Sequence, residues 1–284
     1  MAPAPAIDTK NPEAIRNETR AAFDAMGHRA SHPLIDRLFA DVTALFTGKY
    51  PGYLAIDMRY HDFEHTLQAT LCLVKILVGR QQRRATPEFS RRDCELSLMA
   101  VLLHDTGYLK RSDDSAGTGA KYTMVHVRRS CDFARTYLPA LGVTADELDD
   151  ICHAISCTGP LNKISAVEFR RPEARVMACI LVTADYLGQM GAHDYVEELP
   201  ILFREFQEAY EFEGLPEANR IFHSETELIR KTPAFWELYV RPMLEREAGG
   251  VYHYLDGDRG DNFYLKAVEA NMDEVKRRIA ALPS

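Results

Sequence analysis

The feature that most constrains the fold is a helical spacing of apolar residues along most of the chain. Apolar residues at steps of four, three and three share one face of a helix over about 61–79. These residues are Leu67, Leu71, Val74 and Leu77. Strict alternation of apolar and polar residues, which is typical of a half-buried strand, does not extend beyond a few positions. The sequence therefore predicts an all-α protein built as a single compact multi-helix bundle.

Two segments are apolar on nearly all sides, which is typical of helices buried at the centre of a domain. They cover 96–103 and 174–190. The first is short enough for a buried strand, but the helix-forming residues 91–95 lead into it, so we favour a helix. Periodic apolar residues predict further helices over 122–139, 144–157 and 265–279, with more helix between 203 and 243.

Length and composition indicate one large folded domain. The chain has 284 residues, of which 46% are hydrophobic and 27% are charged, and this excludes a wholly disordered or fibrous protein. Residues 1–32 are rich in alanine, proline and charge, so we expect a loosely structured N-terminal arm that could end in a short helix. We assign 33–284 to one helical domain.

Charge and cysteine usage narrow the partners and the compartment. The formal net charge of −8 argues against binding to duplex nucleic acid, although a local basic pocket for a phosphate remains compatible with it. The six cysteines form no C-x-x-C pair and several lie in apolar runs, which indicates reduced, buried thiols in a cytoplasmic protein. No signal peptide and no apolar run of membrane-spanning length is visible, so no membrane partner is expected.

Residues able to bind a metal gather in three segments. His61 and His65 are four residues apart and would share one face of a helix. His104 and Asp105 are adjacent, so both could reach one ion only at a helix end, where Gly107 would supply the bend. Asp185 is a lone acid in an apolar helix, and burying it is costly unless it is paired or bound to a metal.

The order of these residues resembles a known signature. His65, His104-Asp105 and Asp185 resemble the H…HD…D motif of the HD-domain metal-dependent phosphohydrolases. The lead-in Tyr60-His61 is similar to the Y-H-N-x-x-H motif of class I cyclic-nucleotide phosphodiesterases, and the likeness extends over about 50–245. The resemblance implies an all-α fold around a metal centre.

Three departures separate the chain from the cyclic-nucleotide branch. Asp62 replaces the asparagine of the lead-in motif, and Tyr108 replaces a histidine four residues after the HD histidine. Gly159 stands where that branch has an acid. The resemblance therefore implies the metal centre without implying a cyclic-nucleotide substrate.

The same resemblance implies roles for individual residues. It assigns the first ion to His65, His104, Asp105 and Asp185. Asp105 could bridge to a second ion, which His126 would bind unless it contacts substrate or lies on the surface. His61 is placed to protonate the leaving oxygen. Oxygen and imidazole ligands suit one or two divalent ions, among them Mg, Mn, Fe, Co, Ni and Zn.

Other polar residues have less specific interpretations. Asp62 or Glu64 could hydrogen-bond a ligand imidazole or could be solvated helix charges. His153 lies about one turn before the next ligand position of the family. Lys110, Arg111 and Lys121 flank the loop 112–120, which is either a lid that brings positive charge to a phosphate or a solvated surface loop.

The leading hypothesis is a metal-dependent phosphohydrolase that hydrolyses a nucleotide or another small phosphoester with a metal-activated water. One alternative is a di-metal oxidative enzyme on the same fold, which needs additional histidine ligands such as His126 and His153. Another is a non-catalytic binding or signalling module, which the loss of a metal ligand would favour. All four core ligands are present in the sequence.

Overall fold

The structure is a computed structural model that describes residues 7–29, 31–159, 162–257 and 260–281. Among these residues the regular elements are helices, and β pairing is limited to two isolated bridges. The prediction of an all-α fold is confirmed. The α-helices are α1 (Pro12–Ala25), α2 (Pro33–Phe46), α3 (Phe63–Gln82), α4 (Arg91–Leu103), α5 (His126–Tyr137), α6 (Ala145–Ser156), α7 (Pro172–Met190), α8 (Tyr195–Phe212), α9 (Glu225–Phe235) and α10 (Phe263–Ala281).

Short helical turns connect these elements. The 3₁₀ turns are η1 (Thr106–Tyr108), η2 (Gly119–Tyr122), η3 (Leu138–Leu141), η4 (Ile164–Ala166), η5 (Glu217–Asn219) and η8 (Val251–Leu255). Two π-helical turns, η6 (Trp236–Val240) and η7 (Met243–Glu247), continue α9. The turn η1 follows α4 directly and determines how the chain leaves the candidate site.

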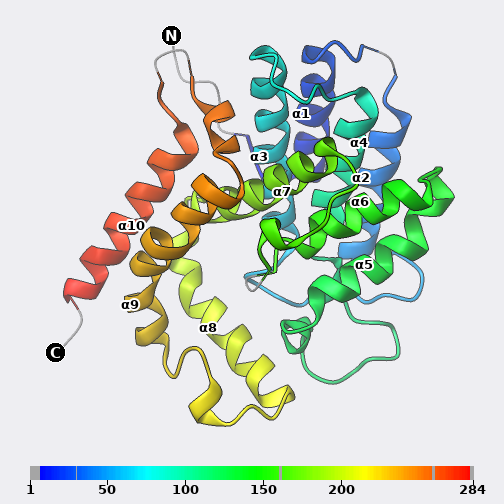
Figure 1. The fold of residues 1–284 in the computed structure, drawn as a ribbon. Coiled ribbons are helices and arrows are strands. Elements are labelled where there is room, and N and C mark those ends of the chain that lie inside the picture. Colours follow the sequence, from blue (N-terminus) through cyan, green and yellow to red (C-terminus); the bar gives the residue numbers. More distant parts are fainter. Residues whose placement is uncertain (1–6, 30, 160–161, 258–259, 282–284) are drawn as a thin grey trace.

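Helices α3 and α7 form the centre of the bundle. Figure 1 shows α7 crossing the middle of the molecule, with α1–α6 mostly on one side and α8–α10 on the other. Both helices bury residues on nearly all sides, as their sequences predicted. Despite these apolar surfaces, no helix in the described part of the chain is long and apolar enough to cross a membrane.

Capping residues fix where the central helices begin. The Asp62 side chain accepts a hydrogen bond of 3.0 Å from the backbone N–H of His65, which starts α3 at the candidate ligand. Ser90 and Asp93 form a capping box at the start of α4. The first cap sets the position of the helix end that carries His65, whereas His104 follows the opposite end of α4 from its capping box.

The N-terminal region differs from the expectation of a loosely structured arm over 1–32. Residues 1–6 lie outside the described residues, but α1 packs against α2 and α3. Ile15 and Phe23 have no exposed surface, because they lie on one face of this amphipathic helix. Asn11 caps α1 through the backbone N–H groups of Glu13 and Ala14. The helix in this region is thus longer than the short helix that the sequence suggested, and it packs into the core.

Gly107 has a different role from the one its position suggested. Its φ angle is not positive, so it does not act as a left-handed helix terminator. A Cβ atom at Gly107 would instead lie 1.9 Å from the carbonyl oxygen of His126, at the start of α5. The residue is glycine because α5 approaches η1 too closely for any side chain.

Gly107→Ala is therefore expected to destabilise the fold by about 1–3 kcal/mol, since backbone atoms of α5 would have to move. Urea denaturation measures this change. Gly159→Ala is the matched control, because its added Cβ would come closest to the end of the Asn162 side chain, at 3.2 Å, and would meet Val127 and the Ser156 carbonyl oxygen at ordinary contact distances of 3.6 and 3.7 Å. Equal stability of the two variants would contradict the steric explanation.

Candidate metal centre

The candidate centre is assembled from helix segments that lie far apart in the sequence. His65 lies in the first turn of α3, and Asp185 lies within α7. His104 and Asp105 follow the last residue of α4, and His126 is the first residue of α5. Because α3, α4 and α7 pack against one another, the side chains they carry meet in the interior.

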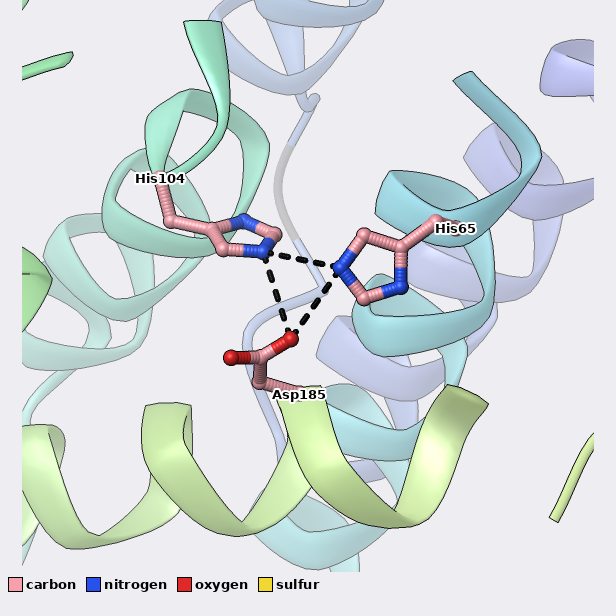
Figure 2. A group of neighbouring side chains, drawn as sticks. All are labelled: His65, His104 and Asp185. Atoms are coloured by element: carbon pink, nitrogen blue, oxygen red, sulfur yellow. Dashed lines mark hydrogen bonds and ion pairs between the residues drawn. The ribbon is translucent and has the colours of Figure 1, made fainter. Parts of the chain in front are cut away.

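Three of these side chains converge on one point (Figure 2). The Nε2 atoms of His65 and His104 lie 3.3 Å apart. The Oδ1 atom of Asp185 lies 3.1 Å from the first of these nitrogens and 3.5 Å from the second. All three atoms fall within the 4.8 Å spacing expected of ligands around one ion.

Asp105 connects this group to His126. Its Oδ2 atom lies 3.2 Å from Nε2 of His65 and 3.4 Å from Nε2 of His104. Its Oδ1 atom faces the other way and lies 3.8 Å from Nε2 of His126. One carboxylate therefore borders two neighbouring positions, as a bridging ligand would.

Backbone carbonyl groups orient two of the imidazoles. Nδ1 of His104 lies 2.7 Å from the Val101 carbonyl oxygen, and Nδ1 of His126 lies 2.7 Å from that of Thr123. A carbonyl oxygen can only accept, so each Nδ1 carries the hydrogen and each Nε2 presents a lone pair. Nδ1 of His65 has no partner among the described residues. Its Nε2 lies 3.2 and 3.1 Å from carboxylate oxygens of Asp105 and Asp185, which can only accept, so Nε2 carries a hydrogen.

The protonation states follow from this arrangement. Burial alone would raise the pKa of both carboxyls, but His104 and His65 hold the pKa of Asp105 and of Asp185 well below the usual value. Burial disfavours charged His65, yet hydrogen bonds to the two carboxylates raise its pKa to about 10. In the absence of a metal, His65 is thus the cation that balances the buried carboxylates.

The set of donors fits a divalent cation. At neutral pH a proton on His65 holds the carboxylates of Asp105 and Asp185 together. The same two carboxylates oppose the effect of burial on His104 and raise its pKa. Burial, opposed by Asp105, lowers the pKa of His126, so its Nε2 lone pair is also available. A divalent ion could replace the His65 proton and bind all four core residues.

The residues of the centre differ in their exposure to solvent. The side chains of His65, His104 and Asp105 are at most 5% exposed, whereas Asp185 is 17% exposed. His61 and His126 are also partly exposed, at 18% and 13%. These three residues therefore carry most of the solvent-exposed surface of the group.

His61 is held by an acid that sequence reasoning missed. Nδ1 of His61 lies 2.7 Å from Oε2 of Glu205, a buried residue of α8. The other oxygen of Glu205 accepts hydrogen bonds of 3.1 and 2.8 Å from the backbone N–H groups of Arg59 and Tyr60. The one available signal was a single acid between the apolar residues Phe203 and Phe206.

Comparison with known proteins gives one match. The family model described as Npun_R2479-like matches residues 52–276. The chain belongs to the Npun_R2479-like family. No curated protein matches the chain. The family description contains no activity, so any function has to be argued from the site itself.

The match to the Npun_R2479-like family encloses the whole candidate centre. All residues from His61 to Glu205 that form it lie within 52–276, whereas α1 and α2 precede the matched region. The centre is thus carried by the part of the chain that defines family membership. The two N-terminal helices pack against α3 and α4 of the matched region.

The structure does not bring the predicted lid cations into this centre. Lys110 lies 2.7 Å from an oxygen of Asp57 and donates to the carbonyl oxygen of Gly117. Lys121 is paired with Asp114. Arg111 is exposed and donates to the Tyr53 hydroxyl. Lys110 and Lys121 are therefore already paired with carboxylates, and Arg111 lies in solvent beside Tyr53.

The remaining predicted residues also lie outside the cluster. Asp62 caps α3, as described above, and does not hydrogen-bond a ligand imidazole. Glu64 accepts from Thr9 and pairs with Lys10 of the N-terminal region. His153 lies on α6 against Phe169. None of these contacts involves a side chain of the four core residues.

Proposed function

We propose that the chain is a metal-dependent phosphohydrolase of the HD type, acting on a nucleotide or another small phosphoester. The observation that carries the proposal is the convergence of His65, His104 and Asp185 on one point, with Asp105 beside them. A structural cluster would need only paired charges. This one brings together two carboxylates and two imidazoles, which is a set of donors that fits a divalent ion. Asp185 also leaves the group partly exposed to solvent.

Each residue has a distinct task in this proposal. The four core residues hold the first ion, and Asp105 and His126 border a second position. A bound divalent ion supplies Lewis acidity toward a phosphoryl oxygen and lowers the pKa of water. Glu205 holds His61 by its Nδ1 atom, which leaves Nε2 free to give a proton to the leaving oxygen.

The oxidative alternative finds less support in the geometry. It calls for several histidines beyond the core set. His126 lies beside Asp105, but His153 packs against Phe169 on α6. The hydrolytic proposal needs neither residue as a ligand of the first ion.

The proposed location and partners rest on the cysteines and on the net charge, and not on the candidate site. The six cysteines are free and buried, which agrees with a cytoplasmic protein. The net charge of −8 disfavours duplex nucleic acid as a partner, so the substrate is taken to be a small molecule.

Metal binding to the stripped protein should release about one proton per ion at pH 8. His65 is protonated below its pKa of about 10, and an ion that binds Nε2 must displace that proton. The apparent affinity should therefore rise with pH up to about 10 and then level off. Calorimetry in buffers of different ionisation enthalpy measures the proton, and a phosphoester panel then tests turnover.

His153→Gln is the matched control for this experiment, because it removes a partly buried histidine outside the cluster. It should leave both metal binding and proton release unchanged. Failure of the stripped protein to bind any of the metals named above would refute the proposed function.

A further inference from the structure

Tyr108 is a buried residue of the site to which the mechanism above gives no task. Its ring lies between two imidazoles and is stacked on both. The centroid distance to His61 is 4.7 Å with an interplanar angle of 22°. The distance to His126 is 4.2 Å with an angle of 12°. The side chain is only 1% exposed, so this stack is part of the interior.

The Tyr108 ring is itself held in place. It packs in a small buried cluster with Met58 and Ala120. The backbone of Tyr108 lies in η1, and the N–H group of Tyr108 donates to the carbonyl oxygen of Asp105. The close approach of α5 at Gly107 fixes the start of α5, where His126 lies. The ring is therefore a rigid partner for the two imidazoles.

Each histidine is consequently fixed in two directions. His61 is bound at Nδ1 by Glu205 and covered on a ring face by Tyr108. His126 is bound at Nδ1 by the Thr123 carbonyl oxygen and covered on a ring face by the same tyrosine. In both rings only Nε2 remains for chemistry, so Tyr108 couples the orientations of the two atoms.

We propose that Tyr108 is a positioning residue that acts through His61, and that it adapts the site to phosphoesters of alcohols such as sugars or glycerol. This inference rests on the proposed function. The alkoxide leaving group of such an ester is strongly basic and needs a proton at a fixed place. Esters of acidic phenols leave without one and would gain little from a fixed donor.

The balanced reaction shows where the proton goes. The bond between phosphorus and the alcohol oxygen breaks, and a bond between phosphorus and a water oxygen forms. The alcohol oxygen takes a proton from Nε2 of His61, and the proton lost by water restores His61. An ester and one water thus give the alcohol and a phosphate, with no oxidant or reductant.

Tyr108→Leu tests the inference by removing the ring and keeping an apolar side chain. The rate on an alkyl phosphoester should fall by about 10²-fold, since a donor displaced by about 1 Å loses that much. The loss on nitrophenyl phosphate should be within about threefold, because this leaving group scarcely needs a proton. Tyr108→Phe retains the ring and should recover most of the rate.

Two further measurements separate positioning from a general loss of structure. Tyr137→Leu removes another buried tyrosine, on α5 and outside the site, so it should lower stability without changing the dependence on the leaving group. Combined with His61→Ala, Tyr108→Leu should add little, because both act on one proton transfer. Rates are compared per folded protein.

A readout without substrate keeps the inference testable if the proposed function fails. Stacking on Tyr108 should shift the ring-proton NMR signals of His61 and His126 upfield, and Tyr108→Leu should move both back. Unchanged signals, or an equal loss on both classes of ester, would overturn the positioning role. Absence of hydrolysis by the wild-type chain, with the signals shifting as expected, would overturn the proposed function and the substrate class while leaving the stack established.

Discussion

Asp105→Ala should lose the bound metal ion and the hydrolytic activity together, on every phosphoester tested. Asp105 contacts both His65 and His104 and also faces His126, so its removal leaves these imidazoles with Asp185 as the one carboxylate of the group. Metal affinity should fall by at least about 10²-fold, since the loss of residues that merely support a ligand costs up to that much. The metal content after dialysis and kcat/KM on two esters measure the effect.

Asp150→Ala is the matched control for this substitution. Asp150 is also a buried carboxylate, but it is paired with Arg171 at 2.7 Å and is not among the clustered residues. This variant should lose stability and keep its metal. If Asp105→Ala retained the wild-type metal content, Asp105 would not be a ligand.

The helices that carry the centre were predictable because their signals are local. The apolar surfaces of α3, α4 and α7 follow from spacings of three and four residues, and their bounds differ from the expected ranges by only a few positions. The motif positions His65, His104-Asp105 and Asp185 could also be placed on these helices. Local periodicity and capping suffice for this, since both act within one helix.

The partners of the site residues could not be predicted, because they depend on long-range packing. Glu205 meets His61 across 144 positions of the sequence. Only the packing of α8 against the segment before α3 determines this contact. Similarly, the sequence shows Tyr108 as a departure from a motif, whereas the stack between His61 and His126 depends on the close approach of α5.

The environment of the loop 112–120 could not be predicted either, and the sequence left open whether it is a lid or a solvated surface loop. Lys110 and Lys121 border a polar loop, so they looked available to a phosphate. In the fold both are buried beside acids, Asp57 and Asp114, that the sequence does not single out. Burying an ammonium group is tolerated because each has a carboxylate partner.

His61→Ala should separate proton donation from metal binding. Its metal content should equal that of the wild type, because the four core residues remain. Turnover should fall by roughly 10²–10⁴-fold on esters of alcohols, the usual contribution of a positioned general acid. On nitrophenyl phosphate the loss should be much smaller, since that leaving group departs as an anion.

Glu205→Gln and His153→Ala complete this experiment. Glu205→Gln keeps a hydrogen-bond acceptor near Nδ1 of His61 but removes the charge, so it should lose part of the rate with the same dependence on the leaving group. His153→Ala should change neither rate. If His61→Ala empties the metal site, His61 is a ligand rather than the proton donor. If its losses on the two classes of ester are equal, proton transfer from His61 does not occur in the rate-limiting step, and the hydrogen bond from Glu205 serves only to hold the segment before α3.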